Sequence, residues 1–253
     1  MPPQLSTSSA PCCTLCPFRP ACRLACGNAA SLMPRTVTLR AGDVLYIQGR
    51  AARAVYPIRA GGVKQVFETG IGWRQVSGFL QPGDVCGLEA HEADAHDATV
   101  IALQDTECCA IAVETLRPML RDDPGIRAAV VAMQRRHARR QAELLVAIGS
   151  MKAAQRLAML LLDLAAEQAR RGVADGVLTL AMTRNDIASY LGLTLETVSR
   201  LLSRFGAAGL IIVRQRKLRI VDPDGLAAVH ADGDAVAAPA PPAAAQAGPP
   251  AIP

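Results

Sequence analysis

The 253-residue sequence contains no apolar run that approaches the roughly 18 uncharged residues needed for a membrane-spanning helix. Residues 1–11 have neither a basic cluster nor an apolar stretch, so we expect no secretory signal and a cytoplasmic location. The chain also lacks a phosphate-cradling glycine loop and paired acid and base residues outside its predicted turns, which argues against an enzyme. Hydrophobic residues make up 51% of the sequence, enough for the cores of two compact domains.

The first half of the sequence carries short apolar or β-branched runs separated by turns that contain glycine. The predicted strands are residues 37–39, 44–47, 63–67, 76–80, 99–103 and 109–113. The predicted turns are Gly42-Asp43, Gly61-Gly62, residues 70–72 and residues 82–84. Many short strands at this spacing predict a compact antiparallel barrel or roll.

After Pro124 the apolar spacing becomes helical. Apolar residues recur at three- and four-residue steps, as a helix that pairs with a partner helix requires: Ile126, Val130, Met133, Leu144, Ile148 and Met151. His137 and Arg140 interrupt the middle of this face. A second amphipathic helix follows and ends near Gly172, and the Ala/Pro-rich tail after Ala231 is predicted to be disordered.

Residues 183–205 carry the signals of two short helices joined by a turn. Thr183 and Asp186 have the spacing of an N-terminal capping box, and Gly192 suits the left-handed residue that ends the first helix. Thr194 can cap the second helix. That helix would bury Val198, Leu201, Leu202 and Phe205, and its opposite face would present Glu196, Ser199, Arg200 and Ser203.

The opposite face offers the groups that read base edges in a major groove. Arginine pairs with guanine, glutamate accepts from a cytosine amino group, and serine suits a base or a phosphate. Predicted strands at 210–213 and 218–221, joined around Gln215-Arg216-Lys217, form a wing with basic residues for phosphates. The alternative is a helical hairpin with a solvated face. We predict a winged helix-turn-helix whose DNA-contacting residues are Glu196, Ser199, Arg200, Thr194, Thr197 and Arg184.

Eight cysteines in a chain expected to be cytoplasmic indicate metal binding or redox chemistry rather than disulfides. Five of them are close together (Cys12, Cys13, Cys16, Cys22 and Cys26), and the others are Cys86, Cys108 and Cys109. Four thiolates are the usual ligand set of an iron–sulfur cluster. The local set of Cys13, Cys16, Cys22 and Cys26 would also suit zinc.

Residues 192–202 read Gly-Leu-Thr-Leu-Glu-Thr-Val-Ser-Arg-Leu-Leu and closely resemble the recognition helix of the bacterial CRP/FNR family of transcription regulators. The resemblance covers residues 12–230 and is greatest to the oxygen-sensing FNR branch. It implies a homodimer that binds a TTGAT-type palindrome and contacts RNA polymerase, for which residues 68–74 are the candidate loop.

The same resemblance implies an α+β fold in five segments. Residues 1–30 form a metal-binding N-terminus, residues 31–122 an antiparallel β-roll like that of cyclic-nucleotide-binding domains, and residues 123–150 a long dimerisation helix. Residues 151–231 form the winged helix-turn-helix, and residues 232–253 the disordered tail.

The pattern Cys13-x2-Cys16-x5-Cys22 is similar to the N-terminal pattern of oxygen-sensing family members, which hold a [4Fe–4S] cluster with a fourth, distant cysteine. Residues 109–116 resemble the segment that begins at that fourth ligand, so the resemblance implies the set Cys13, Cys16, Cys22 and Cys109, with Cys12, Cys26 and Cys108 as alternates. Nitric oxide is an alternative signal. The segment between Cys22 and Gly42 is shorter than in the family.

Other members of the family bind a cyclic nucleotide or haem in place of an iron–sulfur cluster. Members that bind cyclic nucleotides have an Arg followed by Ser or Thr at the phosphate-binding turn, whereas residues 96–99 here read His-Asp-Ala-Thr. Asp97 would repel a phosphate, so we expect no cyclic nucleotide. Cys86 is placed like the thiolate of haem-based carbon-monoxide sensors, but Leu88 replaces their exchangeable histidine, so haem is not favoured. An iron–sulfur electron carrier or enzyme is the least favoured alternative.

Overall fold

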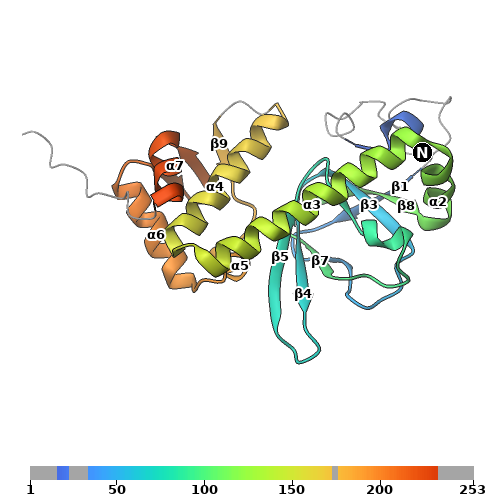
Figure 1. Cartoon of the computed structure of the whole chain (residues 1–253), viewed down its shortest axis with the longest axis horizontal. Coiled ribbons are helices and arrows are strands. Elements are labelled where there is room, and N and C mark those ends of the chain that lie inside the picture. Colours follow the sequence, from blue (N-terminus) through green and yellow to red (C-terminus); the bar gives the residue numbers. More distant parts are fainter. Residues whose placement is uncertain (1–15, 23–33, 173–175, 233–253) are drawn as a thin grey trace, which may run out of the picture. The chain divides into compact units, whose positions relative to one another are not determined.

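The computed structural model describes residues 16–22, 34–172 and 176–232, and Figure 1 traces the elements in chain order. Residue contacts divide the chain into two compact units. The first consists of Met1–Gly149 and Ala181–Thr194, and the second of Ser150–Leu180 and Leu195–Pro253. The helix-turn-helix segment therefore contributes residues to both units.

The core of the first unit is an antiparallel roll, as predicted, and it consists of two four-stranded sheets. One sheet has the order β1-β8-β3-β6, formed by Arg35–Leu39, Thr106–Ala112, Ala54–Ala60 and Val85–Cys86. The other has the order β2-β7-β4-β5, formed by Val44–Tyr46, Thr99–Ala102, Val63–Glu68 and Arg74–Leu80. Apolar side chains from both sheets fill the roll interior: Tyr46, Ile58, Val63, Leu80, Cys86, Val100 and Cys108.

Every predicted strand overlaps an observed one, but β3 and β6 of the roll, and β9 (Val177–Thr179) of the second unit, were not predicted. Pro57 lies within β3, and a proline inside an apolar run argues against a strand because it lacks an N–H group. In the structure Pro57 is paired with Val85 of the two-residue strand β6. The predicted glycine turns are present. Gly61 has a φ of +85°, and a Cβ there would lie 2.4 Å from the carbonyl oxygen of Asp105.

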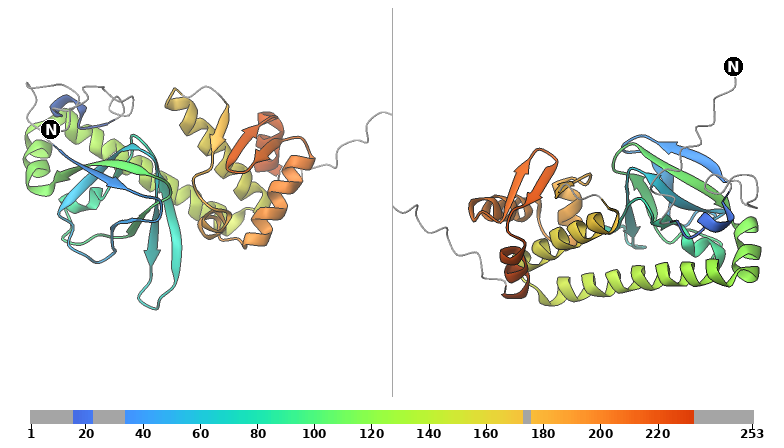
Figure 2. Two further views of the ribbon diagram at one scale, coloured as in Figure 1. Left: turned by 180° about the vertical axis from the view of Figure 1, so that it is seen from behind. Right: turned by 90° about the horizontal axis from the view of Figure 1, so that it is seen from above.

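Helices flank the roll, and Figure 2 shows the long helix α3 running beside it. The 3₁₀ segments are η2 (Arg19–Ala21) and η4 (Leu88–His91), followed by α2 (Val113–Asp122) and α3 (Pro124–Ser150). A second group of buried residues, here called the helix-side cluster, joins these elements to the roll. Its members include Phe18, Cys22, Val55, Val85, Ile111, Leu116, Ile126, Val130 and Met133.

The helix-side cluster corrects one sequence prediction. Ile126, Val130 and Met133 were expected to face a partner helix, yet they pack against the chain's own roll. Arg140, which interrupts the predicted face, is half-buried and brings its Nη1 to 3.9 Å from Oδ1 of Asp84. Helical spacing identifies an apolar face but not the neighbour that covers it.

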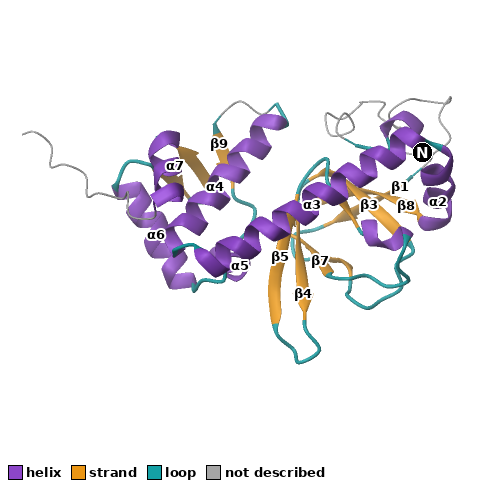
Figure 3. Cartoon of the chain, viewed as in Figure 1, coloured by secondary structure: helices purple, strands orange, loops and turns teal. Residues whose placement is uncertain are grey.

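The second unit packs helices around a small sheet, and Figure 3 distinguishes its helices from its strands. Its helices are α4 (Ala153–Arg170), α6 (Leu195–Ala207) and α7 (Pro223–Asp232). The antiparallel sheet has the order β10-β11-β9, formed by Ile211–Arg214, Lys217–Ile220 and Val177–Thr179. Helix α5 (Arg184–Leu191) belongs to the first unit. Among the described residues, no helix is both long and apolar enough to cross a membrane.

Candidate nucleic-acid interface and cysteine site

Helix α5 begins and ends as its sequence predicts. The amide of Asp186 donates to Oγ1 of Thr183 at 3.1 Å, and the amide of Thr183 donates to Oδ2 of Asp186 at 2.9 Å. This reciprocal pair is the predicted capping box. Gly192 ends the helix with a φ of +62°, and the amide of Leu193 donates to the carbonyl of Ala188. The local sequence therefore determines both ends of the first helix.

Helix α6 has one buried face and one exposed face. Val198, Leu201, Leu202 and Phe205 are buried, which confirms the predicted inward face. Glu196 and Arg200 are exposed and Ser199 is partly exposed, so a carboxylate, a guanidinium and a hydroxyl share the other face. The Ser203 hydroxyl donates to the carbonyl of Ser199 at 3.1 Å. Of the other predicted DNA contacts, Thr194 and Arg184 are exposed and Thr197 is partly buried.

The predicted wing is the β10–β11 hairpin. Arg214 is paired with Lys217 across a two-residue turn, in which Gln215 has a φ of +56°. The amide of Leu180 donates to the carbonyl of Arg216 at 2.8 Å, so the turn is fixed to the strand beside it. Four basic side chains on the hairpin are exposed: Arg214, Arg216, Lys217 and Arg219. Such a charged hairpin suits contact with a phosphate backbone.

The described part of the cysteine-rich N-terminus is a single tight turn, residues 16–22. The amide of Arg19 donates to the carbonyl of Cys16, and the amide of Cys22 donates to the carbonyl of Arg19, both at 3.1 Å. Phe18 anchors the turn in the helix-side cluster and is only 1% exposed. Sequence reasoning missed this anchor, although an aromatic residue between two cysteines is its signal. The predicted ligand Cys13 and the alternates Cys12 and Cys26 lie outside the described residues.

The neighbouring cysteines Cys108 and Cys109 point to opposite faces of strand β8. Cys108 is fully buried in the roll interior, and burial raises the pKa of its thiol to about 11. Neighbouring residues of a strand point to opposite faces, so Cys109 shares its face with Ile111. Ile111 belongs to the helix-side cluster, which also contains Cys22 and contacts Cys16. This alternation associates Cys109, rather than Cys108, with the N-terminal turn.

Within residues 16–22, 34–172 and 176–232, no three His, Cys, Asp or Glu side chains are gathered to hold a metal ion. The chemistry of the donors nevertheless fits an iron–sulfur cluster. Cys16 and Cys22 share one hydrogen-bonded turn on the helix-side cluster, and Cys109 occupies a strand of the same unit. Thiolates from a short turn and from one distant position are a common ligand pattern for such a cluster.

Cys86, the candidate haem thiolate, lies inside the roll. It is 0% exposed and packs in the roll interior with Tyr46 and Cys108. Burial, followed by the neighbouring Cys108 and Asp84, raises the pKa of its thiol well above the usual value. A protonated, enclosed thiol of this kind behaves as a small core residue.

A cavity of about 750 Å³ lies between the roll and α3, within the first unit. The roll contributes the carboxylates of Asp84, Glu89 and Asp97 to its wall, while α3 contributes Arg136 and Arg140. His96 is buried, stacks on Tyr46 at 3.7 Å between ring centroids, and places Nδ1 2.9 Å from Oε1 of Glu89. The side of the cavity formed by the roll is therefore acidic, which is unfavourable for a phosphate.

The candidate loop for RNA polymerase joins β4 to β5 at the end of a long hairpin (Figure 1). Ile71 and Trp73 are 81% and 74% exposed. Glu68 and Arg74 close the base of the loop with an ion pair of 3.2 Å. Exposed apolar side chains at a hairpin tip are typical of a contact surface.

Two family profiles match most of the folded chain. The profile of the Crp-like helix-turn-helix domain matches residues 155–229, and that of the cyclic nucleotide-binding domain matches residues 36–123. The first match covers the elements of the second unit together with α5 of the first unit, and the second match covers the roll and α2. Helix α3 lies between the two matched regions, so the matches and the structure together bear out the predicted order of a roll, a long helix and a winged helix-turn-helix.

Comparison with individual proteins also identifies transcription regulators as relatives. The chain is 36% identical over 195 residues to the transcriptional regulatory protein btr of Bordetella pertussis, covering 77% of this chain and 81% of that protein. It is 31% identical over 199 residues to the fumarate and nitrate reduction regulatory protein of Salmonella typhimurium, covering 79% and 80%. The solved structure of FixK2 from Bradyrhizobium japonicum superposes with a TM-score of 0.71 at 29% identity, covering 78% of this chain and 97% of that one.

Proposed function

This chain belongs to the CRP/FNR family of transcription regulators, and from that premise we propose that it is an oxygen-responsive sensor that binds TTGAT-type palindromes as a homodimer. The family consists of DNA-binding regulators, not enzymes. The observation that carries the DNA-reading part of the proposal is the exposed face of α6, where Glu196, Ser199 and Arg200 stand opposite a buried apolar face.

The reading chemistry follows from those side chains. Arg200 would pair with a guanine, Glu196 would accept from a cytosine amino group, and Ser199 would contact a base or a phosphate. Thr194, Thr197, Arg184 and the basic wing would contact the phosphate backbone and orient the helix. A palindromic site then requires two copies of the chain related by a two-fold axis.

A second face of α3 supports the homodimer. Seven exposed residues follow alternating three- and four-residue steps: Ala128, Val131, Arg135, Ala138, Ala142, Leu145 and Gly149. This is the spacing of a helix that pairs along a coiled-coil seam, and its small residues permit close approach. Leu145 is 73% exposed in the single chain, so a partner helix would remove it from water. We propose this seam in place of the face that packs against the roll.

The sensing part of the proposal rests on the cysteines. Cys13, Cys16, Cys22 and Cys109 would hold a [4Fe–4S] cluster, which when bound supplies iron and sulfide that react with oxygen and with nitric oxide. Phe18 would hold the N-terminal turn on the helix-side cluster independently of metal. The acidic wall of the cavity supports the expectation that no cyclic nucleotide binds, and the enclosed Cys86 disfavours haem. Structural zinc is the second candidate, because Cys26 would complete a local four-thiolate set.

Cytoplasmic location and contact with RNA polymerase complete the proposal. The hairpin tip with Ile71 and Trp73 is the surface we assign to the polymerase. Its apolar side chains would be removed from water in such a contact.

The test begins with protein purified without oxygen. We expect near-equal iron and acid-labile sulfide, a visible spectrum that bleaches when air is admitted, and loss of dimer on bleaching. Zinc without iron would overturn the oxygen-sensor proposal, as would an unchanged spectrum in air. In parallel, affinity for a TTGAT palindrome should exceed that for a scrambled site and fall on the order of 1,000-fold between about 50 and 200 mM salt. Equal affinity for both sites would contradict specific DNA reading.

A further inference from the structure

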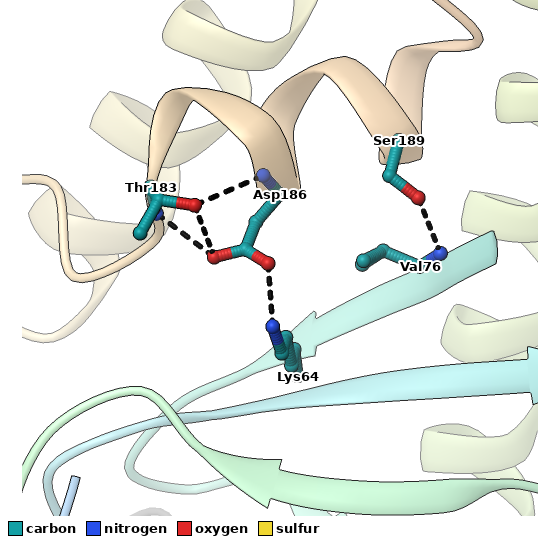
Figure 4. Close-up of polar contacts among 5 residues, drawn as sticks. All are labelled: Lys64, Val76, Thr183, Asp186 and Ser189. Atoms are coloured by element: carbon teal, nitrogen blue, oxygen red, sulfur yellow. Dashed lines mark hydrogen bonds and ion pairs between the residues drawn. The ribbon is translucent and has the colours of Figure 1, made fainter. Parts of the chain in front are cut away.

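Helix α5 docks on strands β4 and β5 of the roll through three contacts, one from Lys64 on β4 and two from β5, drawn in part in Figure 4. Nζ of Lys64 lies 2.5 Å from Oδ1 of Asp186. The backbone amide of Val76 donates to Oγ of Ser189 at 2.9 Å. The ring of Tyr190 lies on that of Phe79 with centroids 5.0 Å apart. The first helix of the helix-turn-helix is therefore held by the roll, as the division into units also indicates.

The docking site is an irregularity in an edge strand. Strand β5 ends the sheet order β2-β7-β4-β5, so its outer backbone groups have no neighbouring strand in that sheet. Gln65 is paired with Gly78, but the next residue, Val66, is paired with Val76. Ser77 is thus the extra residue of a β-bulge. Bulges redirect backbone groups and are common beside functional sites.

Two different helices bind the backbone at this bulge. Ser189 of α5 accepts from the amide of Val76, and Nε2 of Gln141 on α3 donates to the carbonyl of Ser77 at 2.7 Å. The following residue is Gly78, where a Cβ would lie 3.1 Å from Oε1 of Gln65 and 4.0 Å from Nε2 of Gln141. A side chain at this position would crowd Gln65 on the neighbouring strand β4, whereas Gln141 would lie at an ordinary contact distance.

We propose that this bulge, residues 76–78, is a coupling joint between α3 and α5. A displacement of α3 acts on the Ser77 carbonyl through Gln141, and the bulge passes it to the Val76 amide and so to Ser189. The Lys64–Asp186 pair keeps α5 on the sheet while this happens, because Lys64 belongs to β4 and Asp186 is the capping-box partner of Thr183, the residue that caps that helix. The regulatory consequence rests on the proposed function, since α3 would move when the dimer forms. The joint itself is a property of the fold.

Amide hydrogen exchange tests the joint without DNA. Gln141→Leu removes the hydrogen bond from α3 to the Ser77 carbonyl on β5 and touches no residue of α5. Losing one hydrogen bond costs on the order of 1 kcal/mol, which corresponds to about a fivefold change in an opening equilibrium. If the bulge couples the two helices, exchange of the amides of residues 184–191 should therefore speed up about fivefold. The matched control is Gln134→Leu, the same substitution two helical turns earlier on α3, which should leave α5 unchanged. Unchanged exchange in α5 with Gln141→Leu, or an equal effect from the control, would overturn the proposal.

DNA affinity gives a second readout, because coupled residues have non-additive effects. If the bulge couples α3 to α5, the double variant Gln141→Leu/Ser189→Ala should change DNA affinity no more than whichever single variant has the larger effect. Effects that multiply would show that α3 and α5 act independently. Sedimentation of each variant confirms that the comparison is made at equal dimer content. If the wild-type protein shows no specific DNA binding, the proposed function fails while the exchange result still decides the joint.

Discussion

The reading helix and the cysteine site are built in opposite ways. Helix α6 carries its buried anchor and its exposed reading face within 13 consecutive residues. The cysteine site draws on a turn at residues 16–22 and on a strand that begins at Thr106, and both depend on the packing between them. The chemistry of a surface made by one helix depends little on distant segments, whereas a site made by two distant segments fails when their packing fails. We therefore expect sequence preference to be the more robust of the two proposed properties, and sensing the more easily lost.

The largest expected effect is on iron and sulfide content, which should differ between variants of the neighbouring residues Cys108 and Cys109. Cys109→Ala should abolish iron and sulfide incorporation, because it removes one of four thiolate ligands. Cys108→Ala should retain near-normal incorporation, since Cys108 packs in the roll interior. Both contents can be measured on protein purified without oxygen. Loss of iron in the Cys108 variant and retention in the Cys109 variant would reverse the assignment made from strand alternation.

Removing the aromatic anchor should damage the sensing region selectively. Phe18→Ala leaves a cavity in the helix-side cluster, and burial of this kind is worth about 3–5 kcal/mol of unfolding free energy. We expect lower stability in chemical denaturation and faster loss of iron, with an unchanged preference for the TTGAT sequence. The matched control is Phe67→Ala, since Phe67 on the β4–β5 hairpin is 47% exposed and belongs to neither buried cluster. A parallel loss of sequence preference would show that the two regions are less separate than proposed.

Within the reading helix, Arg200→Ala should weaken specific binding by about 1–3 kcal/mol, or roughly 5- to 150-fold, through loss of a guanine contact. Discrimination at that base should relax at the same time. Arg121→Ala removes the same charge from an exposed position on α2 and should leave discrimination intact. Titration of DNA sites that differ at one base measures both quantities. A uniform loss on all sites would reassign Arg200 to a phosphate.

The smallest expected effect concerns pH. Burial alone would raise the pKa of Asp186, but hydrogen bonds from Lys64 and Thr183 lower it below its usual value. A lowered folded-state pKa stabilises the fold at neutral pH, and that contribution is lost as pH falls below about 4. Lys64→Met should therefore cost on the order of 1 kcal/mol at pH 7 and progressively less under acid. Lys217→Met, on the exposed wing, should show no such pH dependence; a constant difference for Lys64→Met would contradict the mechanism.

The same contrast explains what the sequence could predict. The capping box of Thr183 and Asp186, the Gly192 turn and the burial of α6 were predictable because each depends on neighbours within a few residues. The strand with Pro57 was missed because a proline inside an apolar run argues against a strand, and only the pairing with β6 and β8 shows that it is one. The face of α3 was assigned to the wrong neighbour for the same reason. The choice of Cys109 over Cys108 came from the resemblance and stays a prediction; the burial of Cys108 in the roll interior supports it.

The exposed hairpin tip has a practical consequence. Trp73 is the single tryptophan of the chain, is 74% exposed and belongs to neither buried cluster of the first unit. Its intrinsic fluorescence should therefore start red-shifted and change little when the cores unfold. Removal of the indole from water by a bound protein would shift the emission to shorter wavelengths and shield it from a soluble quencher. Without any label, the protein thus carries an optical reporter for the surface that we assign to RNA polymerase.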